Sequence, residues 1–310
     1  MTQPQLRYKR LKGMIVCPIQ TCFHLAHDTG IWCCAWGKQD IIISGSKDNS
    51  LKIWQWSEDS LKALHSCEGH RLGVLSLAVS SDGSFFASSG LDTQIIFWDI
   101  ASGTQLRTFD GGASNVWSID MSPDDSIVAT GTHDGALSLI DVQKAEQKKR
   151  IEFNNKFVLS VCFSPDGSKL AWGDMQGSVK IYDLTSDTHI NMDGHSMPIR
   201  SLAFSPDGRY MVSTSDDKTL KLYDVTDRRV QRTFCGHNGM VTSSQFSPDG
   251  TMVLTSSIDK TVKIWNLSTS TCQSTMQDHE EQVWCARYNP DGSKCVTASE
   301  DKSILVYDLS

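Results

Sequence analysis

A histidine, an aspartate and a hydroxyl-bearing residue recur together along this chain, and these three residue types make up the catalytic relay of serine hydrolases. One such set is His70, Ser88 and Asp92. In a hydrolase the hydroxyl oxygen attacks the substrate, the imidazole takes its proton and the carboxylate orients the imidazole. The residue types alone therefore permit acyl-transfer chemistry.

The repetition of this set indicates a structural role instead. Five copies occur along the chain, each followed by an aromatic residue, whereas an active site needs only one copy. The sequence also contains no nucleophile elbow, phosphate loop or HExxH element. A buried and fully hydrogen-bonded set fixes local structure, and losing one partner costs about 1 to 3 kcal/mol. We therefore predict that the protein is not an enzyme and that these residues form a structural hydrogen-bond network. The predicted network contains His27, Ser44, Asp48 and Trp54; His70, Ser88, Asp92 and Trp98; His195, Ser213, Asp217 and Tyr223; His237, Thr255, Asp259 and Trp265; and His279, Thr297, Asp301 and Tyr307.

These sets lie on a repeat of near-constant length. A Trp-Asp dipeptide or a variant of it closes each repeat, and successive closing positions are 44, 42, 42, 41, 42 and 42 residues apart. The closing positions are Gln55, Asp99, Asp141, Asp183, Asp224, Asn266 and Asp308. Seven repeats use nearly all of the 310 residues, so no second domain fits. A repeat of this length and ending predicts a β-propeller.

Turn motifs divide each repeat into short strands. SPDG or a close variant occurs in six of the repeats, for example at 164–167 and 247–250. Pro, Asp and Gly in this order favour a tight turn, and alternating apolar runs on both sides predict four strands per repeat. The predicted fold class is all-β: a seven-bladed propeller over residues 14–310, preceded by a flexible basic tail at residues 1–13.

The seventh repeat contains only three strands. Residues 19–25 precede His27 in the way that the outer strands of other repeats precede their histidines. A blade needs a neighbour on each face, and an unpaired strand edge invites aggregation. We predict that this N-terminal strand completes the last blade and closes the ring.

The fourth repeat departs from the pattern. Asn154, Trp172 and Gln176 stand where the other repeats mostly have histidine, serine or threonine, and aspartate. This predicts either the softest blade of the ring or a blade held by a large indole in place of polar bonds.

A variable column lies five residues after the histidine position. The residue before it is always Ile or Val and the residue after it is always Ser or Cys, which is typical of packed core positions. The variable column itself fits no uniform core, so we predict that it opens at one end of the ring, the top face, as a partner-binding surface. Trp and Arg are prominent in binding hot spots. The predicted partner-binding residues are Trp32, Leu75, Trp117, Phe157, Leu159, Arg200, Met240 and Trp284, and Thr242 completes the column. In the alternative interpretation the tryptophans plug the central channel against one another.

Composition limits the possible partners. A formal charge of −7 argues against a broad phosphate-binding surface, because nucleic-acid affinity depends on many cationic contacts. Ten cysteines without Cys-x-x-Cys pairs disfavour zinc and fit a reducing compartment, and the vicinal Cys33 and Cys34 are expected to pack as small hydrophobes. No apolar run reaches the length of a membrane span. We expect no cofactor, no metal, no direct nucleic-acid partner and no membrane. The basic cluster within residues 7–12 fits either a nuclear address or a solvated tail.

The periodic elements GH, SPDG and WD resemble those of the WD-repeat family along the whole chain. Several longer stretches resemble the WD-repeat subunits of the superkiller complex. These stretches include AHDTGIWCCAWG at 26–37, EGHRLGVLS at 68–76, GTHDG at 131–135, KFVLSVCFSPDG at 156–167 and DHEEQVW at 278–284. The finer resemblance runs from about residue 24 to the end, apart from the loop 143–150.

This resemblance implies a seven-bladed scaffold without enzymatic activity. Its implied partners are a tetratricopeptide scaffold protein and, through it, an RNA helicase that feeds the cytoplasmic exosome in mRNA decay. In animals and plants the resemblance also implies membership of the nuclear polymerase-associated factor complex, and in fungi a role in meiotic DNA cleavage. Partner segments in that family dock on the top surface around aromatic residues. The expected localisation is cytoplasmic and nuclear.

Three classes of function follow from the sequence. The leading hypothesis is the scaffold of an RNA-decay assembly. The second is a chromatin or transcription adaptor that recognises a modified or acidic peptide through Arg200. The third is a hydrolase or isomerase built on a propeller, which requires convergent carboxylates or metal ligands at the channel mouth, and the repeat columns supply none.

Overall fold

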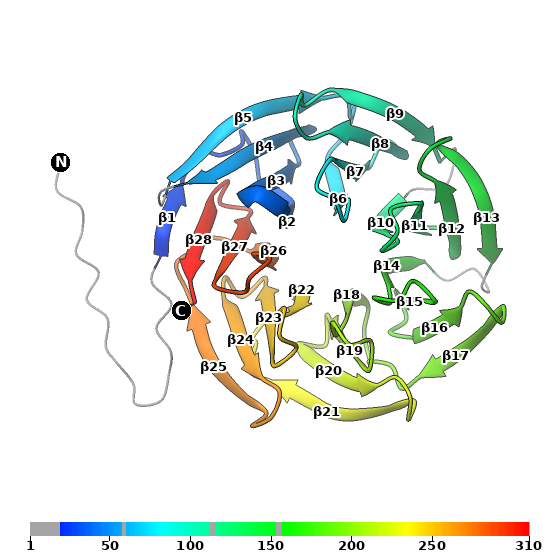
Figure 1. Cartoon of the computed structure of the whole chain (residues 1–310). Coiled ribbons are helices and arrows are strands. Elements are labelled where there is room, and N and C mark those ends of the chain that lie inside the picture. Colours follow the sequence, from blue (N-terminus) through cyan, green and yellow to red (C-terminus); the bar gives the residue numbers. More distant parts are fainter. Residues whose placement is uncertain (1–18, 58–59, 112–115, 153–156, 310) are drawn as a thin grey trace.

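Seven four-stranded antiparallel sheets surround one axis in this protein (Figure 1). The computed structural model describes residues 19–57, 60–111, 116–152 and 157–309. The predicted all-β, seven-bladed propeller is confirmed. The predicted basic tail at residues 1–13 and the predicted start of the propeller at residue 14 lie outside the described residues.

Each of the first six blades takes four consecutive strands. The first blade contains β2 (Ile31–Trp36), β3 (Ile41–Ser46), β4 (Ser50–Ser57) and β5 (Ser60–Glu68), and a short 3-10 helix, η1 (Lys38–Asp40), joins β2 to β3. The second contains β6 (Val74–Val79), β7 (Phe85–Gly90), β8 (Gln94–Asp99) and β9 (Gln105–Asp110). The third contains β10 (Val116–Met121), β11 (Ile127–Thr132), β12 (Ala136–Asp141) and β13 (Glu146–Glu152). The fourth contains β14 (Val158–Phe163), β15 (Lys169–Asp174), β16 (Val179–Asp183) and β17 (Thr188–Met192). The fifth contains β18 (Ile199–Phe204), β19 (Tyr210–Ser215), β20 (Thr219–Asp224) and β21 (Arg229–Cys235). The sixth contains β22 (Val241–Phe246), β23 (Met252–Ser257), β24 (Val262–Asn266) and β25 (Thr271–Met276).

The seventh blade combines strands from the two ends of the sequence. Its inner strands are β26 (Val283–Tyr288), β27 (Lys294–Ser299) and β28 (Ile304–Asp308), and its outer strand is β1 (Ile19–Phe23). β1 runs antiparallel to β28 and lies beside it in Figure 1. The predicted closure by an N-terminal strand is therefore confirmed.

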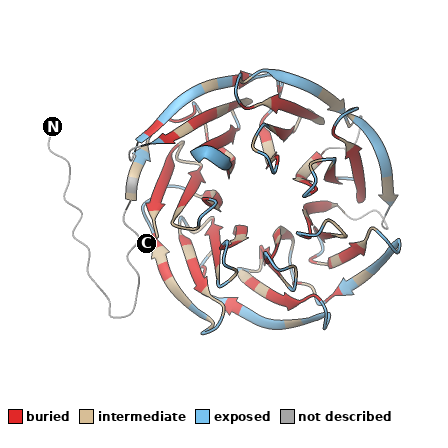
Figure 2. Cartoon of the chain, in the orientation of Figure 1, coloured by how far each residue is buried: buried red, intermediate tan, exposed pale blue. Residues whose placement is uncertain are grey.

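The core of the protein lies between neighbouring blades. Figure 2 shows buried residues along the inner strands of each blade and exposed residues along the outer strands. Ile53 on β4 packs in one cluster with Phe86 and Trp98 of the second blade. At the seam between the last and first blades, Trp54 packs in one cluster with Val306. Each blade thus buries its faces only against its neighbours, and the seam is packed as the other boundaries are.

We expect removal of residues 1–25 to destabilise the propeller. The change removes β1, exposes the edge of β28, and takes away Phe23, whose ring centroid lies 5.0 Å from that of Trp54. The truncated protein should melt at a lower temperature and aggregate in size-exclusion chromatography. Removal of residues 1–13 alone serves as the control and should change neither property. A monomeric protein lacking residues 1–25 with an unchanged melting temperature would contradict the role given to β1.

Candidate partner-binding face

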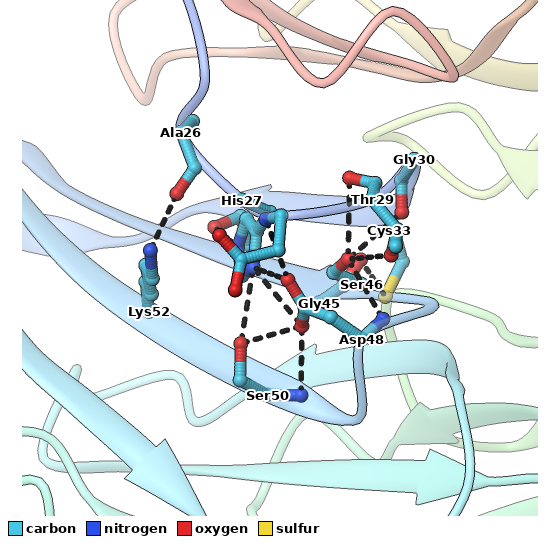
Figure 3. Close-up of polar contacts among 12 residues, drawn as sticks. Ala26, His27, Thr29, Gly30, Cys33, Gly45, Ser46, Asp48, Ser50 and Lys52 are labelled. Carbon is cyan, nitrogen blue, oxygen red and sulfur yellow. Dashed lines mark hydrogen bonds and ion pairs between the residues drawn. The ribbon is translucent and has the colours of Figure 1, made fainter.

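The first blade contains one complete copy of the histidine network, and Figure 3 shows the part of it around His27, Asp48 and Ser50. His27 Nε2 lies 2.8 Å from Ser44 Oγ, which also accepts a 2.9 Å hydrogen bond from the indole N–H of Trp54. On its other side, His27 Nδ1 lies 3.1 Å from Asp48 Oδ2. The imidazole therefore connects the interior of the blade to the aspartate at its turn.

The aspartate joins two loops at the same end of the blade. Asp48 Oδ2 accepts the backbone N–H of Asp28 at 2.9 Å, and its Oδ1 accepts the backbone N–H of Ser50 at 3.0 Å. Asp28 belongs to the loop before β2, whereas Ser50 begins β4. One carboxylate thus holds the entry to the innermost strand against the turn between the two middle strands.

The other four copies have the same geometry. The Nε2-to-hydroxyl distances for His70, His195, His237 and His279 are 2.8, 2.6, 2.8 and 2.7 Å. Their shortest Nδ1-to-carboxylate distances are 3.0, 2.8, 3.0 and 2.8 Å. The hydrogen bond between the aromatic side chain and the hydroxyl measures 2.8 Å for Trp98, 2.8 Å for Trp265 and 3.1 Å for Tyr223. Within the described part of the seventh blade the hydroxyl of Tyr307 does not bond to Thr297, so that copy of the predicted network is incomplete.

Burial favours the neutral form of the histidine in these sets. In the copies that contain a tryptophan the indole N–H donates to the hydroxyl oxygen, and a neutral imidazole with its proton on Nδ1 can donate to the carboxylate while its Nε2 accepts from the hydroxyl. Burial lowers the pKa of His27 to about 4 and also lowers the pKa of His70, His195 and His237. All five hydroxyl residues are 0% exposed, so none of these oxygens can meet a substrate. The arrangement therefore acts as an internal brace.

The fourth blade replaces the brace with an aromatic side chain. Trp172 is 1% exposed at the hydroxyl position, and the ammonium of Lys180 lies 5.7 Å from its ring centroid. Asp174, which is 2% exposed, accepts the backbone N–H groups of Gln176 and Ser178 and thereby stabilises the turn. Asn154 lies outside the described residues. The sequence left open a soft fourth blade or a blade held by an indole, and the burial of Trp172 is consistent with the second alternative.

The variable column owes its position to a repeated backbone irregularity. In every blade the register between the two innermost strands shifts at this residue, as it does at Trp32 between Ile31 and Cys33. A bulge leaves one residue unpaired and redirects its side chain. The other shifts occur at Leu75, Trp117, Leu159, Arg200, Thr242 and Trp284. Seven bulges therefore place these side chains around one mouth of the central channel, the top face.

The seven bulge residues line a single open cavity of about 530 Å³ on the axis of the ring. Trp32, Trp117 and Trp284 are half-buried, so these indoles are neither fully exposed nor sealed in the interior. Trp117 packs edge-on against the half-buried Phe157, with ring centroids 5.5 Å apart. Met240 is also half-buried, in the loop before β22. The top face therefore presents apolar surface that is partly accessible to solvent.

Two of the predicted top-face residues differ from expectation. Leu159 is only 3% exposed, so it contributes little accessible surface although it lines the axial cavity. Arg200 forms a two-bonded ion pair with Asp216, with Nε to Oδ1 at 2.7 Å and Nη2 to Oδ2 at 2.8 Å. The charge of Arg200 is therefore already balanced within the protein.

The acidic partners of the top face were absent from the predicted site. Glu300 Oε2 accepts the indole N–H of Trp284 at 2.9 Å and that of Trp32 at 3.3 Å. It thereby bridges the last and first blades across the seam. Glu300 and Asp216 both occupy the position directly before the network aspartate, where the other repeats have Lys, Leu, His, Met or Ile. The carboxylates of Asp216 and Glu300 at a position that is not acidic in the other repeats were the sequence signal that could have identified these two residues.

The Ser/Cys column beside the bulges joins each innermost strand to the next blade. The hydroxyl of Ser118 accepts the backbone N–H of Val161, and that of Ser243 accepts the N–H of Ala286. At the seam Cys285 Sγ lies 3.4 Å from the carbonyl oxygen of Cys34. Ser160 is the exception, since its buried hydroxyl has no hydrogen-bond partner among the residues that the structure describes. The ring is thus held by polar bonds as well as by apolar packing.

The described residues contain neither of two other kinds of site. No group of three or more His, Cys, Asp and Glu side chains among them is placed to hold a metal ion. In the same ranges, no helix has the length and apolar character needed to cross a membrane.

The radial sheets and the repeated His-Asp brace define a WD-repeat β-propeller, and the chain belongs to that family. Residues 30–308 match the family model described as "IFT122 first beta-propeller". WD-repeat propellers are generally non-enzymatic and typically act as scaffolds for protein interactions.

Segments of the chain are also similar to individual curated proteins. An 88-residue segment is 48% identical to the WD repeat-containing protein SL1-17 of Schistosoma mansoni and covers 27% of this chain and 29% of that protein. A 65-residue segment is 42% identical to the small ribosomal subunit protein RACK1y of Oryza sativa subsp. japonica, covering 21% and 19%. A 72-residue segment is 35% identical to the ribosome biogenesis protein WDR12 homolog of Drosophila persimilis, covering 21% and 17%. Each match therefore spans less than a third of the relative.

We expect His237→Ala to lower stability by about 1 to 3 kcal/mol, because Thr255 and Asp259 would each lose a buried hydrogen bond. Thermal and denaturant unfolding measure the effect. The neighbouring Asn238 has an exposed side chain, so Asn238→Ala is the matched control. Equal stability of the two variants would contradict the bracing role.

We expect the protein to lose stability as the pH falls from about 6.5 to 4. The pKa of His27 is lowered to about 4, whereas an unfolded histidine titrates near about 6.5. Between these values the unfolded chain binds a proton that the folded chain does not, so acidification favours unfolding. Denaturant unfolding over this pH range measures the slope, and His27→Gln should make it shallower. An unchanged slope would show that His27 does not contribute.

Proposed function

We propose that this protein is a scaffold that binds a segment of a partner protein over its top face. The observation that carries this proposal is the set of seven aligned bulges, which place three half-buried tryptophans around one open cavity. Tryptophan is among the residue types that most often dominate binding energy, and a partner would complete the burial of these indoles. The buried hydroxyls of the histidine sets leave the protein without an accessible nucleophile at these positions.

The chemistry of the face favours an apolar or aromatic anchor on the partner. Trp117 and Phe157 form a continuous aromatic surface on one side of the mouth. On the other side, Glu300 fixes the indoles of Trp32 and Trp284 by hydrogen bonds, so little ordering entropy is lost when a partner contacts them. A rigid aromatic rim of this kind accepts an inserted side chain.

The alternative, an adaptor that reads an acidic or modified peptide through Arg200, has less support. Asp216 already occupies two donors of that guanidinium, and its own side chain is 6% exposed. An anionic peptide would therefore meet a charge that Asp216 already balances, and taking over the two donors bonded to Asp216 would leave a largely buried carboxylate without its partner. We retain this chromatin or transcription adaptor as the second candidate, and preferential binding of histone tails would favour it.

The finer proposal is that the protein is a subunit of the superkiller complex that supports exosome-mediated decay of cytoplasmic mRNA. Its support is the resemblance of the stretches at 26–37, 68–76, 131–135, 156–167 and 278–284 to the WD-repeat subunits of that complex. The proposed partners are a tetratricopeptide scaffold protein and, through it, an RNA helicase. A second pool within a polymerase-associated transcription elongation complex would place the protein in the nucleus as well as the cytoplasm. Affinity purification with mass spectrometry from separate cytoplasmic and nuclear fractions tests both assignments.

We expect Trp117→Ala to weaken capture of the partner by about 30-fold or more, the loss typical of a hot-spot residue. Binding of the purified variant to the captured partner measures the effect, and circular dichroism confirms that the variant is folded. Leu106→Ala is the matched control, because Leu106 is 46% exposed on the outer strand β9, away from the top face. A folded Trp117→Ala protein with undiminished binding would contradict the proposed face.

A further inference from the structure

Two cysteines face each other across the seam of the ring. Cys34 lies on β2 and Cys285 on β26, which are the neighbouring innermost strands of the first and last blades. Cys285 Sγ lies 3.4 Å from the carbonyl oxygen of Cys34, and both thiols are free. Both side chains also belong to one buried cluster that spans the boundary between the two blades. The two thiols are therefore close neighbours at the seam.

The surroundings distinguish the two thiols chemically. The contact with Cys34 and, against the effect of burial, the nearby guanidinium of Arg287 lower the pKa of Cys285. The same contact and burial raise the pKa of Cys34. Arg287 follows Cys285 by two residues on β26, so both side chains lie on the same face of the strand. Cys33 and Asp120 also act on the guanidinium. Arg287 is therefore placed to stabilise a thiolate at Cys285, which makes Cys285 the attacking sulfur in the scheme below and Cys34 the resolving one.

Only small molecules can reach this pair. Cys34 and Cys285 are 2% and 4% exposed, yet both line the axial cavity, as do Cys33, Asp120 and Arg287. An oxidant of the size of hydrogen peroxide fits this access, whereas a bulky alkylating reagent does not. Cys22 and Cys235, by contrast, are exposed on the outside.

We propose that Cys285 and Cys34 form an oxidative modification site at which hydrogen peroxide converts the two thiols into a disulfide joining the first and last blades. The Cys285 thiolate attacks one peroxide oxygen, the O–O bond breaks, and hydroxide leaves as water after protonation. Cys285 is then a sulfenic acid. The Cys34 sulfur attacks the Cys285 sulfur, its proton and the departing hydroxide form a second water, and the S–S bond forms. Two thiols are oxidised and one peroxide is reduced to two waters.

This bond would close the ring covalently at the boundary that β1 closes by strand pairing. The linked residues are separated by most of the chain, so the disulfide would restrict the unfolded state over a very long loop. Glu300 bridges the same boundary on the top face through Trp32 and Trp284. Oxidation would therefore reinforce a seam that the reduced protein holds only by non-covalent contacts.

The test uses the full-length protein. Exposed thiols are first capped with N-ethylmaleimide, the protein is treated with hydrogen peroxide, and non-reduced peptides are examined by mass spectrometry. We expect a peptide pair linking Cys34 to Cys285, and a melting temperature higher by about 5 °C that dithiothreitol reverses. Cys285→Ser should abolish both changes, whereas the matched control Cys272→Ser, on the outer part of the sixth blade, should retain them.

Two results would overturn the proposal. One is peroxide treatment that yields sulfinic acid at Cys285, or no reaction there, without the linked peptide. The other is a linked peptide that forms without any increase in the melting temperature, because the bond would then not reinforce the seam. Both measurements apply to the unmutated protein, so they decide the matter even where Cys285→Ser fails to fold.

Discussion

Each blade of this propeller has two apolar faces, and no single sheet can bury both of them. The apolar clusters accordingly cross the boundaries between blades, as where Trp98 of the second blade packs with Ile53 of the first. The seam obeys the same requirement, with Trp54 packed in one cluster with Val306. Because every blade depends on two neighbours, the ring must close for any blade to be complete. Burial of the apolar faces requires this packing of blade on blade. The histidine braces and the Ser/Cys bonds then fix the loops and the inner strands within it.

The two ends of the central channel differ in how far their side chains are buried. At the top face the bulges release one side chain per blade from the alternation of the strand, and Trp32, Trp117 and Trp284 remain half-buried there. At the other end of the same strands, Trp36, Met121 and Tyr288 are buried, with 9%, 8% and 5% exposure. The backbone irregularity is therefore what makes one mouth suited to a partner, because regular strands would have packed both ends alike.

The repeat could be predicted from the sequence because every blade packs against its neighbours in the same way and uses similar residues at equivalent positions. The strand number, the closing strand β1 and the five histidine sets all follow from that recurrence. Contacts that occur only once could not be predicted from the repeat. Glu300 meets Trp32 only because the ring closes, and the pairing of Arg200 with Asp216 depends on the shape of one bulge. Leu159 shares its column with half-buried side chains, yet it is itself only 3% exposed. A column of variable residues therefore predicts where a surface lies, but not which of its residues are accessible or already paired.

The mixed origin of the seventh blade has a consequence for biosynthesis. Ile19 pairs with Tyr307, so β1 leaves the ribosome long before its partner strand β28 has been translated. Contacts this distant in the chain form slowly, and unpaired strand edges are prone to misassembly while they wait. The other six blades are contiguous in sequence and can assemble in order behind the emerging chain. β1 is thus a strand that must remain without its partner while the six contiguous blades are being made.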